Sequence, residues 1–406
     1  MRPLLLILGL TLTVYPTLDI ELRTRYARDQ SMEQQFCQFR LCDDQRVYRA
    51  AAKKLWGTAT PNPKEAAAGF LVLLRRDPNF PFPWANLGDA LSASQRSSEA
   101  RYCFRQAVAL APHWPPILMR AATFYLESGD LQAALPLTSQ ILDQVAQYDS
   151  LVFSSYAREA HSLSLILDRG FPQSNPRPAR AWVSYLIGKN DVLAARQAFR
   201  WLHDKGLNDV QTTDAYVNML LVQHLAPEAL NAWKTALGTK AGSYGESNYA
   251  FNGGFESDFS MSPLDWKSEP RAGVEVSRDD VTPDSGKWSL KIHLDGKHNI
   301  TDTGIHLKIA VPRGRYRLTA RIRTEGLTTD EGIELRLRSL DRSPFTQWTS
   351  RSWLGTNAWS TLQANFEVPV AGNSYTLELL RNASQKFDRN IAGTIWIDNV
   401  RMEPYR

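Results

Sequence analysis

Four arginines in the last third of the chain are the side chains whose spacing most clearly suggests chemistry. Arg321 and Arg323 alternate with apolar residues in one segment, and Arg336 and Arg338 do so in the next. If the two segments are neighbouring strands, this alternation places all four guanidinium groups on one sheet face. Guanidinium forks match carboxylates, so the face would suit an acidic polysaccharide. The alternative is a solvated face on which nearby glutamates neutralise the arginines.

Three aromatic side chains gather in the polar segment that follows. Phe345, Trp348 and Trp353 lie among serine, threonine and arginine residues. A loop or edge strand of this composition suits exposed aromatic rings that stack on the apolar face of a ligand. The alternative is that these rings fill the edge of a sheet or a contact between domains.

The usual sequence patterns of catalytic and metal sites are missing. The seven histidines form no HExxH or similar metal-ligand spacing, and there is no GxSxG, P-loop or GxGxxG motif. The sequence does not exclude a pair of carboxylates for glycoside cleavage, because the fold would bring such residues together. We therefore predict a protein that holds other molecules and is not an enzyme.

Charge and cysteine content narrow the class further. The net charge of +5 is spread along the chain without a long basic run, so nucleic acid is not expected as a partner. Cys37, Cys42 and Cys103 give neither a disulfide framework nor a zinc pattern. A bridge between Cys37 and Cys42 is left open, and Cys103 is expected in the core of a helix pair.

Residues 1–17 predict a signal sequence or an N-terminal membrane anchor. A charged start precedes the apolar run Leu4–Tyr15, but no small-x-small cleavage site follows. The run is shorter than the ~20 residues of a membrane span. We expect an exported protein of the periplasm or cell envelope, with or without attachment to the inner membrane. The alternative is a buried helix, and residues 18–46 are expected to form a helical cap.

Residues 47–237 carry a repeated helical pattern. In the clearest copy, Trp84 and Gly88 mark one helix face, and Ala100 and Phe104 mark the face of the next helix. The pattern resembles the tetratricopeptide repeat, and neighbouring segments keep its 34-residue period. The resemblance implies an all-α solenoid whose groove holds a protein partner. The stretch from about residue 150 to 175 breaks the register, which indicates a degenerate repeat or a kink.

The pattern changes beyond residue 237. Residues 238–248 are small, polar and glycine-rich and predict a linker. In residues 249–406, apolar and polar side chains alternate in short segments, as in Tyr316–Arg323. Many short alternating segments predict an antiparallel β-sandwich. The predicted fold class is therefore multidomain α + β, with helical repeats first and the sandwich last.

The order of motifs in residues 249–406 resembles the jelly-roll domains of carbohydrate-binding modules, the galactose-binding-like group. The segment opens with NGGFE at Asn252–Glu256 and closes with IDNV at Ile397–Val400. The resemblance implies a glycan ligand, for which the aromatic segment would supply stacking faces and the four arginines polar contacts.

The same resemblance implies a structural calcium ion where the opening loop meets the closing strand. Glu256 and Asp398 would supply carboxylates, and backbone carbonyls would complete the oxygen shell that this cation requires. The alternative is that Glu256 caps a turn and Asp398 pairs with an arginine.

These features together predict a non-catalytic adaptor of the bacterial envelope. The helical repeats would bind a protein and the jelly roll a glycan, as in polysaccharide assembly or export systems. Two alternatives are a purely structural scaffold whose sandwich binds no sugar and, less favoured, a glycan-active enzyme.

Overall fold

The computed structural model describes residues 43–57, 60–159, 163–260, 262–339, 347–368 and 374–405. The chain divides into two compact units, Met1–Asn175 and Pro176–Arg406. The predicted signal or anchor, most of the predicted cap, Cys37 and Cys42 lie outside the described residues. In the part of the chain that is described, no helix combines the length and apolarity needed to cross a membrane.

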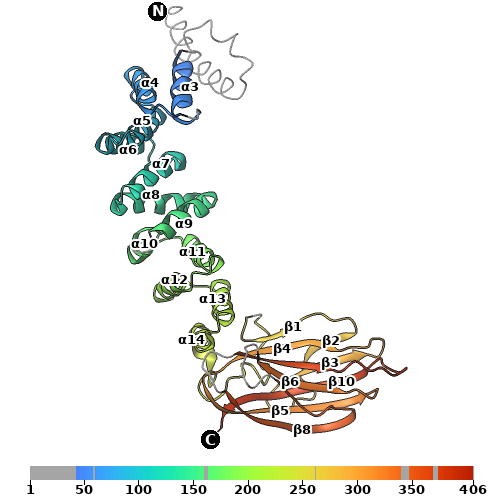
Figure 1. The fold of residues 1–406 in the computed structure, drawn as a ribbon. Coiled ribbons are helices and arrows are strands. Elements are labelled where there is room, and N and C mark those ends of the chain that lie inside the picture. Colours follow the sequence, from blue (N-terminus) through green and yellow to red (C-terminus); the bar gives the residue numbers. More distant parts are fainter. Residues whose placement is uncertain are drawn as a thin grey trace, which may run out of the picture. The chain divides into compact units, whose positions relative to one another are not determined.

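The first unit consists of helices joined by short turns (Figure 1). Three of them start with proline, which lacks a backbone N–H and suits a first turn because N–H groups there have no helical acceptor. The Asp130 carboxylate caps another by accepting the Ala133 N–H at 3.1 Å. The helices are α3 (Asp43–Trp56), α4 (Pro63–Arg76), α5 (Pro81–Ala93), α6 (Ser97–Leu110), α7 (Pro115–Glu127), α8 (Leu131–Gln144), α9 (Asp149–Arg158) and α10 (Leu163–Arg169).

The contact between α5 and α6 depends on a glycine. A Cβ atom on Gly88 would lie 2.9 Å from the ring of Phe104, which is closer than packed carbons tolerate. The Phe104 ring stacks on Phe124 of α7 at a centroid distance of 4.9 Å. Ala100 is fully buried in the same contact. Gly88 and Ala100 therefore allow the two helices to approach closely.

The helices become shorter where the sequence breaks register. The buried hydroxyl of Tyr156 in α9 lies 2.6 Å from Thr138 Oγ1 and 2.9 Å from the Gly170 carbonyl. A Cβ atom on Gly170 would lie 2.6 Å from this hydroxyl. The described part of the irregular stretch therefore contributes to the core, and the first compact unit ends at Asn175.

The second unit begins with two further helix pairs. Phe199 stacks on Tyr216 at 4.1 Å between centroids. Arg196 donates to both carboxylate oxygens of Glu228, at 2.6 and 2.7 Å. The helices are α11 (Arg177–Gly188), α12 (Val192–Asp204), α13 (Val210–Val222) and α14 (Ala226–Leu237).

Two five-stranded sheets follow, ordered β1-β4-β9-β6-β7 and β2-β3-β10-β5-β8 among the described strands. Every described strand pair is antiparallel. The predicted fold class is confirmed, because helices are followed by an antiparallel sandwich. The strands are β1 (Trp266–Ser268), β2 (Val274–Asp279), β3 (Ser289–Asp295), β4 (Asp302–Ala310), β5 (Gly314–Leu327), β6 (Ile333–Ser339), β7 (Gln347–Thr349), β8 (Gly355–Val368), β9 (Ser374–Arg381) and β10 (Ala392–Pro404).

The sandwich core follows the predicted alternation. Leu318 and Ile322 of β5 and Leu335 of β6 are almost fully buried, while the arginines between them face outward. Trp266 and Tyr375 are among the largest buried side chains. Burial of these apolar faces provides most of the free energy that holds the two sheets together.

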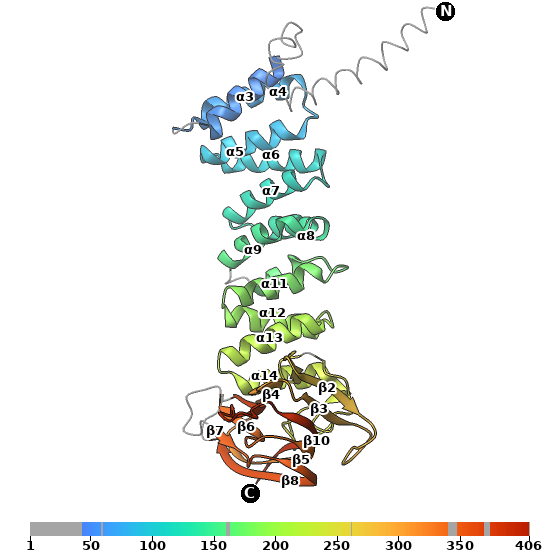
Figure 2. The same ribbon diagram turned by 90° about the vertical axis from the view of Figure 1, so that its right-hand side faces the viewer.

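The segment predicted as a linker is folded in the second unit. Tyr244 is buried, and Asn248 Oδ1 accepts the Met402 N–H of β10 at 2.9 Å. Helix α14 packs on β4, and it is the helix drawn nearest the sheets (Figure 2). The last helix pair and the sandwich therefore form one packed body.

Candidate functional site

The predicted aromatic platform is not assembled as expected. Phe345 lies outside the described residues. Trp353 is 3% exposed, because its backbone exchanges two hydrogen bonds with Ile333, of 2.9 and 3.2 Å. Residues directly opposite in an antiparallel pair point to the same face, and Ile333 points into the core. Trp353 therefore plugs the edge of the sandwich, and its prediction as an exposed platform is wrong.

Trp348 lies in the short edge strand β7. It pairs with Leu337, whose side chain is buried in the core, so the indole lies on the inner side of the sheet edge and is half-buried. The sequence around Trp348 could not predict which side of the sheet the indole occupies, because the register of β7 depends on its pairing with β6.

The four arginines do not share a face, so that prediction is also wrong. Arg321 and Arg323 are on β5, and Arg336 and Arg338 are on β6, which belongs to the other sheet. The chain crosses between the two layers from β5 to β6. Both arginine pairs face away from the core, on opposite sides of the sandwich.

The β5 arginines contact polar and aromatic side chains on the outer face of their own sheet. Arg321 pairs with Asp284 at 2.8 Å. The Arg323 guanidinium lies 4.8 Å from the centre of the Trp396 ring, and Asp279 accepts the Trp396 N–H at 2.9 Å. Trp396 is buried on the outer face of the sheet, beneath the side chains of Arg323 and Lys291. Both arginines have partners within the fold, although the Nε of Arg321 is buried without an acceptor among the described residues.

The β6 arginines lie on an outer face that is more open. Cross-strand pairing sets His306, Glu378 and Arg336 in one row, and Lys308, Thr376 and Arg338 in the next. We call these six residues the charged face. Arg338 is about half exposed and uses one N–H to bond Glu378 at 3.1 Å. A guanidinium has five donors, so Arg338 keeps donors for a ligand.

Arg336 on the charged face is more enclosed. Its Nη2 lies 3.7 Å from Glu334, and its Nε is buried without an acceptor among the described residues. A buried donor of a charged group is costly to leave unpaired. The arginines of the charged face can therefore donate hydrogen bonds to the oxygens of a polar ligand.

The predicted calcium ligands both accept hydrogen bonds from the loop between β2 and β3. Glu256 Oε1 accepts the N–H groups of Lys287 and Trp288 at 2.9 and 3.2 Å. Asp398 Oδ2 accepts those of Asp284 and Ser285, both at 2.9 Å. Burial raises the Asp398 pKa above its ordinary value, although these bonds oppose the shift.

The donor set around these carboxylates tests the calcium prediction. The groups that face them are N–H donors, which do not ligate a cation. Within the described ranges, no cluster of three His, Cys, Asp or Glu side chains could hold a metal. As described, the two carboxylates fit a hydrogen-bonded loop better than an oxygen shell, and calcium stays a prediction.

The first unit has a groove of about 490 Å³. Phe104, Met119 and Phe124 provide its apolar wall, and Leu151 at its edge is 50% exposed. Asp89 and Arg120 form an ion pair within it. The resemblance to tetratricopeptide repeats implied such a groove, but the individual residues were not predicted.

No family model matches this sequence, and no curated protein matches it. Among solved structures, it is similar to TmCBM61 in complex with β-1,4-galactotriose, with 16% identity over 39% of this chain and 99% of that chain and a TM-score of 0.28. A xylan-binding domain from CBM 22 has 17% identity over 39% and 96%, with a TM-score of 0.27. MamA from Desulfovibrio magneticus RS-1 has 15% identity over 50% and 98%, with a TM-score of 0.24. Likenesses this distant do not say what the chain binds.

Proposed function

We propose that this protein is a non-catalytic adaptor of the cell envelope that binds a glycan through its sandwich and a protein through its helical repeats. The observation that supports the glycan site most directly is the charged face, where Arg338 keeps free donors beside Arg336 and Lys308. Carboxylates of an acidic polysaccharide would accept from these donors in a forked geometry.

Affinity electrophoresis in gels that contain polygalacturonate, alginate or neutral xylan tests the glycan site. We expect retention in an acidic gel, reduced about tenfold in affinity by the Arg336→Ala, Arg338→Ala pair, because two charge-assisted contacts are lost. Arg401→Ala is the matched control. Arg401 is similarly exposed, also pairs with a glutamate, and lies in the other sheet. Equal loss in the control, or no retention of the unmutated protein, would favour a scaffold without sugar binding.

The helix pairs would be tetratricopeptide repeats. Proline at the start of α5 and α7, at the 34-residue period, and the Gly88 contact support this assignment. The groove beside Leu151 suits an extended peptide with an apolar anchor residue. On a peptide array, the Leu151→Glu variant should bind more weakly than the Leu193→Glu variant. Leu193 is the control, because it is also an exposed leucine. Equal binding by both variants would remove the groove from the interface.

The envelope location is a proposal that rests on residues 1–17. Cell fractionation of the full chain and of a chain without these residues tests it. We expect export of the full chain and cytosolic retention of the shortened chain. Export of both would contradict the signal.

A structural calcium ion and the lack of enzyme activity have their own tests. If calcium binds near Glu256 and Asp398, its addition raises the melting temperature of the chelated protein, and Glu256→Gln abolishes the rise. Incubation with end-labelled glycans should give no cleavage products. Products that disappear in a carboxylate variant would instead indicate a glycan-active enzyme.

A further inference from the structure

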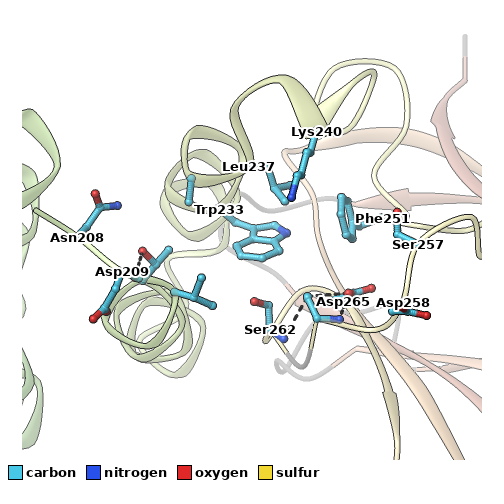
Figure 3. A pocket seen from close by; sticks show the side chains of 14 residues that line it. Asn208, Asp209, Trp233, Leu237, Lys240, Phe251, Ser257, Asp258, Ser262 and Asp265 are labelled. Carbon is cyan, nitrogen blue, oxygen red and sulfur yellow. Dashed lines mark hydrogen bonds between the residues drawn. The ribbon is translucent and has the colours of Figure 1, made fainter. Parts of the chain in front are cut away.

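A pocket of about 730 Å³ lies inside the second unit, between the ends of α13 and α14 and the loop before β1 (Figure 3). It is separate from the charged face. Its size lies within the range of small-molecule sites in proteins. Side chains of the helices and of the sandwich line it together, so neither part alone would form it.

The walls of the pocket are fixed by hydrogen bonds. Ser262 donates to Asp214 of α13 at 2.5 Å, which joins the loop to the helix. Asp265 is fully buried and accepts the N–H and hydroxyl of Ser260, both at 2.7 Å. Such walls need little ordering when a ligand enters, which favours binding.

The indole of Trp233 is the feature that points to a ligand. Its ring lies 5.9 Å from Phe251 between centroids, and the residue is 5% exposed. Its Nε1–H has no acceptor among the described residues. Figure 3 shows this nitrogen on the side of the ring that faces Lys240 and Phe251. A buried N–H is unfavourable without an acceptor, and a ligand atom in the pocket would supply one.

The charges of the lining decide the class of ligand. Asp209 pairs with Arg180 at 3.0 Å, and Asp258 pairs with Arg278. These two carboxylates are neutralised, and the third, Asp265, already accepts hydrogen bonds from Ser260 and Trp266, so a cation finds no strong site. An anion would find only the Lys240 ammonium, and the carboxylates beside it would repel the anion. Uncharged ligands that both donate and accept hydrogen bonds, and that have an apolar face, fit best.

We propose that this pocket binds a short uncharged saccharide. A sugar hydroxyl accepts the Trp233 N–H, and further hydroxyls bond Lys240 and Asn208 at the rim. The C–H face of the sugar ring rests against Phe251. This site goes beyond the charged face, since it takes a different ligand class and needs residues of the helices.

Indole ¹H–¹⁵N spectra of the full chain test the proposal, with the Trp233 signal assigned from Trp233→Phe. The probes are glucose, galactose, mannose, xylose and their β-1,4-linked disaccharides. We expect a saturable shift of the Trp233 signal with at least one probe. The Asn208→Ala, Lys240→Ala pair should weaken this binding about tenfold, because two hydrogen bonds are lost. Lys205→Ala, an exposed lysine outside the lining, should leave it unchanged.

Two results would overturn the proposal. One is that no uncharged probe shifts the Trp233 signal. The other is that glucuronate shifts it as strongly as glucose does. If Trp233→Phe fails to fold, the saturable indole shift that the Asn208→Ala, Lys240→Ala pair weakens identifies the signal instead, because both residues are at the rim of the pocket. The Arg336→Ala, Arg338→Ala pair should keep the shift, so the failure of either site is seen separately.

Discussion

Two arginine–carboxylate pairs join neighbouring helices, one in each unit, yet their carboxylates behave in opposite ways. In the second unit, Glu228 accepts two bonds from Arg196 and one from Tyr216, at 2.9 Å, and its pKa is lowered mainly by the Arg196 bond. In the first unit, Asp89 accepts from Arg120, and burial raises its pKa despite that partner.

The presence of an ion pair therefore does not set the direction of the carboxylate's pKa shift, because burial dominates at Asp89 and hydrogen bonds dominate at Glu228. Glu228 is saturated with donors and acts as a structural clamp. Asp89 lines an apolar groove, where burial outweighs the bond from Arg120. The number of hydrogen bonds within the fold also separates the buried arginines of the sandwich from Arg338 on the charged face.

The largest effect is expected at the arginine with the most bonds. Arg381 is 3% exposed, and all its donors reach oxygens of Asn299, Ile300, Thr329, Glu331 and Arg389. Arg381→Met should lower the free energy of unfolding of the sandwich by about 3–5 kcal/mol, since it leaves buried carbonyls unpaired. Hydrogen exchange of β9 under native conditions measures this.

Arg401→Met is the control for this change, because Arg401 is exposed and bonds its neighbours Asn399 and Glu403. It should change exchange in the sandwich little. A loss in Arg381→Met no greater than in the control would show that bond number does not decide the structural value of these arginines.

A smaller effect is expected at the clamp of the second unit. Arg196→Met removes two charge-assisted bonds from Glu228 but leaves the Tyr216 hydroxyl, so we expect a loss of about 1.5–3 kcal/mol. Hydrogen exchange of α12 and α14 measures it. The Arg196→Met, Glu228→Met double variant should recover part of the stability, because no unpaired carboxylate remains. Without such recovery, the pair would not be the source of the loss.

These bonds also show where sequence reasoning stopped. Helix contacts such as Gly88 with Phe104 repeat at a fixed spacing, so their pattern was visible in the chain. Strand alternation gave the core of β5 and β6 in the same way. Partner strands were not visible, because β5 and β6 are adjacent in sequence but lie in different sheets.

The candidate site was therefore only partly foreseen. Arg336 and Arg338 were recognised as outward-facing, but their grouping with the β5 arginines failed on topology. Trp353 was misplaced because its bridge to Ile333 joins segments that no local pattern relates. The Trp233 pocket was missed because Trp233 sits at a repeat position typical of core packing, and the loop that completes the pocket lies across the predicted linker.

The groove pair should contribute less to stability than the clamp. Arg120→Met removes one bond to Asp89 and a contact with Trp56, whose ring centre is 5.5 Å away. We expect a loss of about 1 kcal/mol in unfolding free energy, because one charge-assisted bond is removed instead of two. Hydrogen exchange of α5 and α7 measures it. A loss equal to that of Arg196→Met would mean that the groove pair is structural and not available to a partner.

The smallest effect is expected in the pH dependence of stability, where the contributions of the two carboxylates should change in opposite directions. The lowered pKa of Glu228 means that its stabilisation is present above the ordinary pKa of 4.5 and is lost as the pH falls through the lowered value. The raised pKa of Asp89 means that its contribution is present below the ordinary pKa of 3.8 and is lost as the pH rises through the raised value. Hydrogen exchange between about pH 3 and pH 6 measures the stability of each unit in the unmutated protein, in Glu228→Gln and in Asp89→Asn. Each variant should remove one pH-dependent contribution to stability from its own unit, and the two contributions should have opposite signs. Slopes of the same sign would mean that burial, and not the number of donors, dominates at both pairs.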